Sequence, residues 1–100
     1  MQSKMKLLIS QKIKHKLANK TPPVTEEEIV QCFSNRTGEY LEDNREDHKS
    51  DPPTKWFIAE TDYGVKLKIV FIFYPDRGVA IRSAYAPNQD EIRIYDKYAY

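Results

Sequence analysis

The sequence has few of the features that mark secreted or membrane-spanning proteins. It contains one cysteine, Cys32, so no internal disulfide can form and a reducing compartment is expected. Its longest unbroken apolar stretch, Ile69 to Tyr74, is far shorter than the roughly 20 residues that a membrane-spanning helix needs. The first ten residues hold only a short apolar run, Leu7 to Ile9, which is too short for a signal peptide. We therefore expect a cytoplasmic protein without a membrane partner.

The motifs of several common enzyme classes are also missing. The chain has three glycines and no glycine-rich phosphate loop, no paired-cysteine zinc pattern and no Gly-x-Ser-x-Gly nucleophile elbow. The spacing of its histidines and acids matches no known metal site, so neither a metal nor another cofactor is expected. With 100 residues, the chain has the length of a single domain, and we expect that domain to span residues 1–100.

Charge is distributed unevenly although the net charge is only +1. Residues 1–20 contain six lysines and no acid, whereas residues 26–47 contain eight acids against Arg36 and Arg45. Lysines on one surface can bind phosphates by displacing counterions from a nucleic acid. The same pattern is more often that of a solvated helix face, so the charge alone does not identify RNA as a partner.

Local patterns predict three helices and several strands. Ser10 is suited to cap a helix that extends to about Asn19, and Thr25 and Glu28 form a capping box for a second helix. Asn88 with Glu91 predicts a third helix that extends to about Tyr98. The expected strands cover residues 5–9, 40–42, 55–61, 65–74 and 79–85, and the polar segment 43–54 is expected to be a loop.

The order of these elements predicts an α+β fold. Short connections between the last strands require antiparallel pairing, which gives a meander sheet. We expect the two N-terminal helices and the C-terminal helix to pack on one side of this sheet and to leave the other side free of helices.

Three cations are candidates for binding RNA on that free side. If Leu67, Ile69 and Phe71 face the helices, alternation along the strand turns Lys66 and Lys68 the other way. Arg82 stands between two alanines, Ala80 and Ala84, and its guanidinium could hold a phosphate as negative charge builds in a transition state. A polar sheet face that simply meets water would show the same residues.

The segment around His48 supplies the other candidates. The His48 imidazole could act as a general acid or base, with Lys49 as an auxiliary cation. Arg45 could bind a phosphate, and Trp56 could stack on a base or lie in the core. Tyr85, at the end of a predicted strand, could donate a proton or pack against neighbouring side chains. Cys32 falls on an apolar helix stripe and is expected to be buried and inert.

Several segments together resemble BrnT-type toxins within the RelE-like ribonuclease superfamily. The segment from His15 to Leu17 followed by Val24 to Ile29 resembles their helix pair, and Ile81 to Tyr85 resembles one of their strands. Glu91 and Tyr95 fall where the last helix of that family has a similar Glu-x-x-x-Tyr. The resemblance implies a RelE-like fold, metal-independent cleavage of mRNA, and control by an antitoxin protein encoded with the toxin.

The chain departs from that family at two positions. BrnT-like proteins tend to have arginines where this chain has Tyr85 and Ala80. Three hypotheses therefore stand. The first is an endoribonuclease toxin that uses Arg82, His48, Tyr85 and Lys49 for catalysis and Lys66, Lys68, Arg45 and Trp56 for RNA binding. The second is a catalytically inactive protein-binding module, and the third is an unrelated α+β domain.

Overall fold

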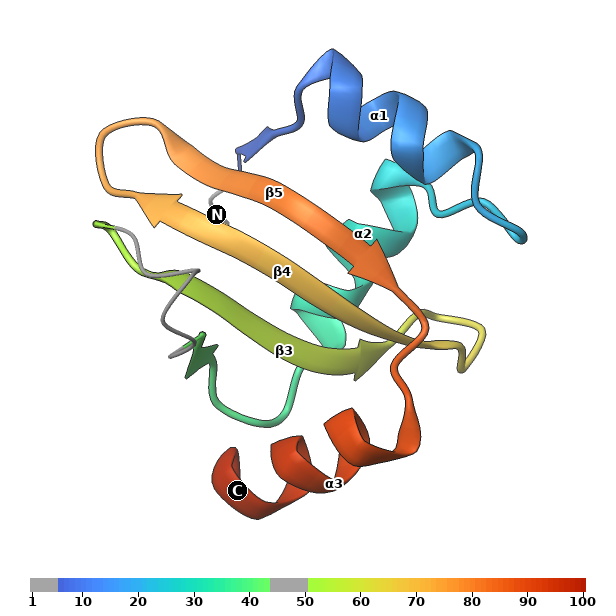
Figure 1. Ribbon diagram of the computed structural model, residues 1–100, viewed down its shortest axis with the longest axis vertical. Helices are drawn as coiled ribbons and strands as arrows, with labels where there is room; N and C mark the ends of the chain where they lie inside the picture. The colour runs from blue at the N-terminus through green and yellow to red at the C-terminus, as the bar shows by residue number, and fades with distance from the viewer. Residues whose placement is uncertain (1–5, 44–50) are drawn as a thin grey trace.

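The computed structural model of the chain describes residues 6–43 and 51–100. These residues form an α+β fold of three helices and a five-stranded sheet (Figure 1). The elements in chain order are β1 (Leu7–Leu8), α1 (Gln11–Ala18), α2 (Glu26–Asn35), β2 (Leu41–Glu42), β3 (Thr54–Glu60), β4 (Lys66–Tyr74), β5 (Gly78–Tyr85) and α3 (Gln89–Tyr98).

The helix starts follow the predicted caps. The Ser10 hydroxyl accepts a hydrogen bond from the Ile13 backbone N–H at 3.2 Å. Capping boxes begin both α2, at Thr25, and α3, at Asn88. In each box the glutamate side chain accepts a hydrogen bond from the backbone N–H of the capping residue. These side chains satisfy backbone donors that have no partner within the helix, which fixes where each helix begins.

The sheet has the order β1-β5-β4-β3-β2. Strands β2 to β5 pair antiparallel, which confirms the predicted meander, but β1 pairs parallel with β5. The sheet as a whole is therefore mixed. The parallel edge arises because α1 and α2, together with β2 to β4, lie between β1 and β5 in the chain, which is the kind of long connection that parallel pairing requires.

The prediction that all helices share one side of the sheet is wrong. Phe33 of α2 lies with its ring centroid 4.7 Å from that of Phe57, and α2 crosses behind the sheet in Figure 1. Helix α3 instead contacts the opposite face, where Trp56 lies 5.7 Å from Tyr95 between ring centroids. The sequence of β3 explains this arrangement: Phe57 and Ile58 are consecutive and both buried, so both faces of the strand need a cover.

The main core lies between the sheet and the pair α1 and α2. Strand alternation places Leu67, Ile69 and Phe71 of β4 on this side as predicted, and all three are buried. Val65, just before β4, and Phe73, near its end, continue this alternation in the sequence but are each 48% exposed. The other face is covered by α3 only in part, and this leaves a hollow beside the helix.

Candidate functional site

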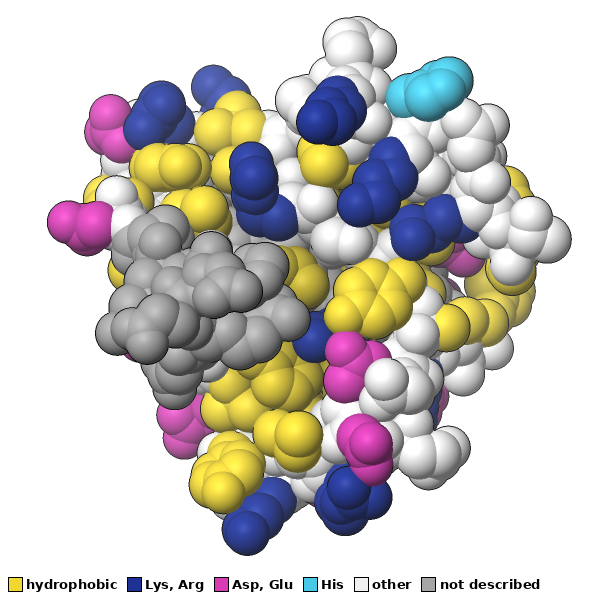
Figure 2. Space-filling view, in the orientation of Figure 1, with side chains coloured by type: hydrophobic (Ala, Val, Ile, Leu, Met, Phe, Trp, Pro, Cys, Tyr) yellow, Lys and Arg dark blue, Asp and Glu magenta, His cyan; other side chains and the backbone are white. Residues whose placement is uncertain are grey.

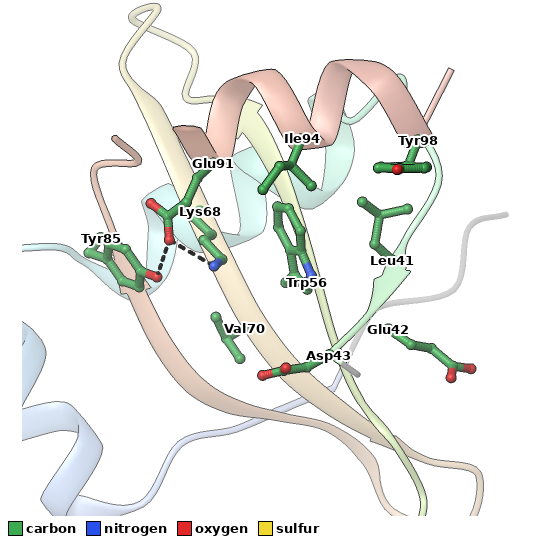
Figure 3. A pocket seen from close by; sticks show the side chains of 10 residues that line it. All are labelled: Leu41, Glu42, Asp43, Trp56, Lys68, Val70, Tyr85, Glu91, Ile94 and Tyr98. Carbon is green, nitrogen blue, oxygen red and sulfur yellow. Dashed lines mark hydrogen bonds and ion pairs between the residues drawn. The ribbon is translucent and has the colours of Figure 1, made fainter. Parts of the chain in front are cut away.

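A pocket of about 910 Å³ lies between α3 and the open part of the sheet (Figure 3). Its apolar wall consists of Leu41, Trp56, Val70, Ile94 and Tyr98. Its polar lining consists of Glu42, Asp43, Lys68, Tyr85 and Glu91. Strands β2, β3, β4 and β5 and helix α3 all contribute, so the pocket exists only in the folded domain.

Three polar side chains are joined by hydrogen bonds at one end of the pocket. The Lys68 ammonium donates to Glu91 Oε2 at 2.9 Å, and the Tyr85 hydroxyl donates to the same oxygen at 2.8 Å (Figure 3). The Lys68 and Glu91 side chains are only 13% and 20% exposed, so their ion pair is largely shielded from water. We call these three residues the Lys–Glu–Tyr triad.

The local sequence positions each member of the triad. Lys68 and Tyr85 are cross-strand partners in the β4–β5 ladder, so their side chains lie on the same face. Glu91 is the third residue of α3, and its other oxygen, Oε1, accepts the Asn88 backbone N–H at 2.9 Å. The residue that completes the capping box therefore also connects α3 to the sheet.

Burial and hydrogen bonding shift two titrations in the triad. Burial, followed by the hydrogen bond to Glu91, raises the pKa of the Tyr85 phenol, and the nearby Lys68 only partly opposes this. Burial alone would raise the pKa of Glu91, but hydrogen bonds from Lys68, Asn88 and Tyr85 outweigh it and lower that pKa. At neutral pH Tyr85 is thus a neutral phenol and Glu91 is a carboxylate.

Two aromatic rings surround the Lys68 ammonium. Its Nζ lies 4.4 Å from the centroid of the Trp56 ring and 5.6 Å from that of Tyr85. Both distances are within the range of cation–π attraction. The structure thus brings together Lys68, Trp56 and Tyr85, three residues that the sequence singled out.

Arg82 lies elsewhere on the sheet. Ile81 pairs with Phe71 and Ser83 pairs with Val70, so Arg82 is the extra residue of a β-bulge in β5. Its exposed side chain lines a separate hollow of about 570 Å³, together with β1 and the start of α1. The expectation that Arg82 faces the same groove as the two lysines assumed unbroken alternation, which the bulge interrupts.

Of the remaining sequence candidates, the structure describes one, Lys66. It is exposed and lines a third hollow, beside Asn35 and Asp96. The predicted residues Arg45, His48 and Lys49 lie outside the described residues. Of the five predicted site residues that the structure describes, three line the pocket, and Arg82 and Lys66 lie elsewhere.

Cations gather on α1 and the neighbouring part of β5. We call the set Lys12, Lys14, Lys16, Lys20 and Arg82 the basic strip. Lys14 lines the same hollow as Arg82, and the Lys20 ammonium lies 5.6 Å from the centroid of the Tyr85 ring. Figure 2 shows Lys and Arg side chains across the part of this face that α1 and β5 occupy. Helix α1 contains no acid, although Glu26 of α2 also lines the hollow.

Sequence reasoning did not identify Glu91, Asp43 or Tyr98 as site residues. A signal existed for two of them: Glu91, Ile94 and Tyr98 recur at helical spacing in α3, on the side that faces the pocket. The capping role of Glu91 was recognised, but its second oxygen binds a lysine 23 residues earlier. Such a long-range pair depends on where α3 packs.

None of the three helices in residues 6–43 and 51–100 is long and apolar enough to cross a bilayer. No cluster of three or more His, Cys, Asp or Glu side chains is arranged to hold a metal ion in this part of the chain. Cys32 is fully buried, as expected, and burial raises the pKa of its thiol to about 12.

No family model, curated protein or solved structure matches the chain. The resemblance to BrnT-type toxins therefore stays a prediction. The functional argument that follows rests on the residues and geometry of this chain.

Proposed function

We propose that the chain binds single-stranded RNA on the face formed by α1 and β5. The observation that carries this proposal is the basic strip: three lysines on α1, Lys20 just past its end and Arg82 in the adjoining bulge, with no acid in the helix. Lys12, Lys14, Lys16 and Arg82 are all exposed and can reach phosphates without unfolding any element. Binding of this kind gains most of its free energy from the release of counterions.

The position of the Tyr85 ring favours a single-stranded RNA ligand over a duplex. Its ring is half-buried on β5, and the Lys20 ammonium stands 5.6 Å from the ring centroid. An aromatic ring beside a cation can stack on an unpaired base while the cation binds the neighbouring phosphate. In a duplex the bases are already stacked on one another and do not offer this contact.

Cleavage of the bound RNA is the narrower form of the proposal, and the family resemblance supports it. A base would take the ribose 2′-hydroxyl proton, a cation would stabilise the phosphorane, and an acid would protonate the leaving 5′-oxygen. Arg82 is suited to the second role because its guanidinium is exposed. Tyr85 could serve only as the acid, since its raised pKa keeps the phenol protonated. The hydroxyl, which donates to Glu91 in the structure, would have to turn from Glu91 to the leaving oxygen to deliver its proton. The base would then be His48, which the structure does not describe.

The same resemblance supports two accompanying proposals. An antitoxin protein would bind the chain and suppress its activity. The protein would act in the cytoplasm, where its single, buried thiol is compatible with a reducing environment.

Fluorescence anisotropy with labelled single-stranded RNA tests the binding proposal. We expect log Kd to rise with log salt, with each phosphate contact adding about 0.7 to the slope. Arg82→Ala should weaken binding and lower the slope by about 0.7. The matched control is Arg93→Ala, which removes an exposed arginine on α3 and should leave Kd unchanged. Equal losses from the two variants, or no binding at low salt, would refute the proposal.

Cleavage is measured on the same RNA with purified protein, with and without EDTA. A metal-independent ribonuclease should cut equally in both conditions, and Arg82→Ala should lose most of the activity while still binding. If the RNA stays intact while binding is confirmed, the chain is an RNA-binding module without this chemistry.

A further inference from the structure

The β-bulge at Arg82 decides which face of the sheet the end of β5 presents. Ile81, just before the bulge, is buried in the main core. Unbroken alternation would turn Ser83 and Tyr85 to that same side. The extra residue reverses the alternation, and the cross-strand partners of Ser83 and Tyr85 in β4 both line the pocket on the opposite face. Ser83 and Tyr85 are therefore neighbours on the face that α3 covers only in part.

The Ser83 hydroxyl is an available hydrogen-bonding group on this face. Its residue is half-buried, and the hydroxyl has no hydrogen-bond partner among residues 6–43 and 51–100. A serine hydroxyl can both donate and accept a hydrogen bond. Because this hydroxyl is attached one carbon from the backbone, it can reach only a group that lies against the strand itself.

Three groups follow one another along β5 in the order of the parts of a nucleotide. Tyr85 offers a ring for a base, Ser83 a hydroxyl, and Arg82, exposed in the bulge, a cation. Two residues of a strand span about 6.5 Å, a distance that the ribose attached to a stacked base can bridge. A phosphate that follows this ribose then lies toward the Arg82 end of the strand. Base, sugar and phosphate thus each meet a group of matching chemistry.

We propose that Ser83 hydrogen-bonds to the ribose 2′-hydroxyl of the nucleotide whose base stacks on Tyr85, so that this face selects RNA over single-stranded DNA. The 2′-hydroxyl is itself a donor and an acceptor, and DNA lacks it. The basic strip and the Tyr85 ring would bind either polymer, because both polymers carry phosphates and unpaired bases. Ser83 therefore supplies a discrimination that the rest of the face does not. This inference rests on the proposed RNA binding and names the group by which RNA is recognised.

Fluorescence anisotropy with two labelled oligomers tests this assignment. One is an oligouridylate of about six nucleotides, and the other is the oligodeoxyuridylate of the same length, which differs only at the 2′ position. We expect the RNA to bind about fivefold more tightly than the DNA, as one hydrogen bond between neutral groups allows. Ser83→Ala should remove this difference by weakening the binding of RNA, and it should leave the Kd for DNA unchanged.

A conservative variant and a matched control show whether the hydroxyl itself is responsible. Ser83→Thr keeps a hydroxyl at the same position and suits a strand, so it should retain most of the preference for RNA. Ser34→Ala makes the same chemical change as Ser83→Ala at an exposed position of α2, and it should alter neither Kd. The wild-type comparison of the two oligomers needs no variant and therefore does not depend on how well any of them folds.

The outcomes separate this inference from the proposed function. If the wild type binds both oligomers with the same Kd, recognition of the 2′-hydroxyl is refuted, while RNA binding through the basic strip stands. If Ser83→Ala weakens both oligomers equally, Ser83 contacts a base or a phosphate and the inference is refuted. If Ser83→Ala keeps the preference for RNA, another group recognises the ribose and the inference is again refuted. If neither oligomer binds, both proposals are refuted.

Discussion

Removal of the Glu91 carboxylate is the sharpest test of how α3 is held to the sheet. Glu91 binds Lys68 and Tyr85 through one oxygen and the Asn88 N–H through the other. Breaking a buried ion pair from one side costs about 3–5 kcal/mol, and the 13% and 20% exposure of the two partners places this pair at the lower end. With about 0.5 kcal/mol for the capping contact, we expect Glu91→Ala to cost about 3.5 kcal/mol. Glu91→Gln keeps one acceptor oxygen, which can accept from Lys68 and Tyr85 or from the Asn88 N–H but not from both sides, and should cost about 1–2 kcal/mol.

Urea unfolding followed by Trp56 fluorescence measures these values, and a double-mutant cycle isolates the pair. Lys68→Met combined with Glu91→Gln should show a coupling energy of about 1–2 kcal/mol. The Arg93–Asp90 pair, whose side chains are 72% and 73% exposed, is the matched control and should show no measurable coupling. If the Lys68–Glu91 cycle gives no coupling either, the ion pair does not hold α3 in place.

The pH dependence of stability follows from the same carboxylate. Because folding lowers the pKa of Glu91, the group contributes stability above its unfolded pKa of about 4.3. That contribution is lost as the pH falls through the folded pKa. Glu91→Gln has no such group, so the free energy of unfolding of the variant should approach that of the wild type below about pH 4.

Two further predictions concern the core and the β4–β5 turn. Cys32 should not react with a thiol reagent at pH 8 until the protein unfolds, because burial, followed by Glu28 and Asp62, raises its pKa to about 12; a fast reaction of native protein would contradict this. Gly78→Ala should lower stability by about 1–3 kcal/mol, because φ is +126° and the new Cβ would lie 2.6 Å from the Lys6 carbonyl oxygen. Gly64→Ala, at φ +82° with no atom closer than 4.0 Å, should cost less, and equal urea midpoints for the two variants would refute the steric argument.

Much of the local structure could be predicted because its causes are local. The capping boxes at Thr25 and Asn88 are confirmed, as is the antiparallel meander of β3, β4 and β5. Ser10 also caps α1 as predicted. Each of these features depends on residues within a few positions of one another, or on a short connection that allows only antiparallel pairing.

The side of the sheet that α3 covers could not be predicted in the same way. It depends on whether apolar residues of β3 are buried on one face or on both, and the run Trp56 to Ala59 fits either arrangement. For a related reason, the bulge at Arg82 could not be predicted from the sequence. A one-residue insertion leaves the composition of a strand unchanged but turns the side chains beyond it to the other face.

Tyr85 connects the pocket beside α3 with the basic strip. Its hydroxyl is held by Glu91, so the ring keeps a fixed orientation, with the Lys20 and Lys68 ammonium groups each 5.6 Å from its centroid. Its raised pKa keeps the phenol neutral, so Tyr85 adds no negative charge where phosphates would approach. Lys68 is already paired with Glu91. The triad thus leaves the attraction of phosphates to the basic strip.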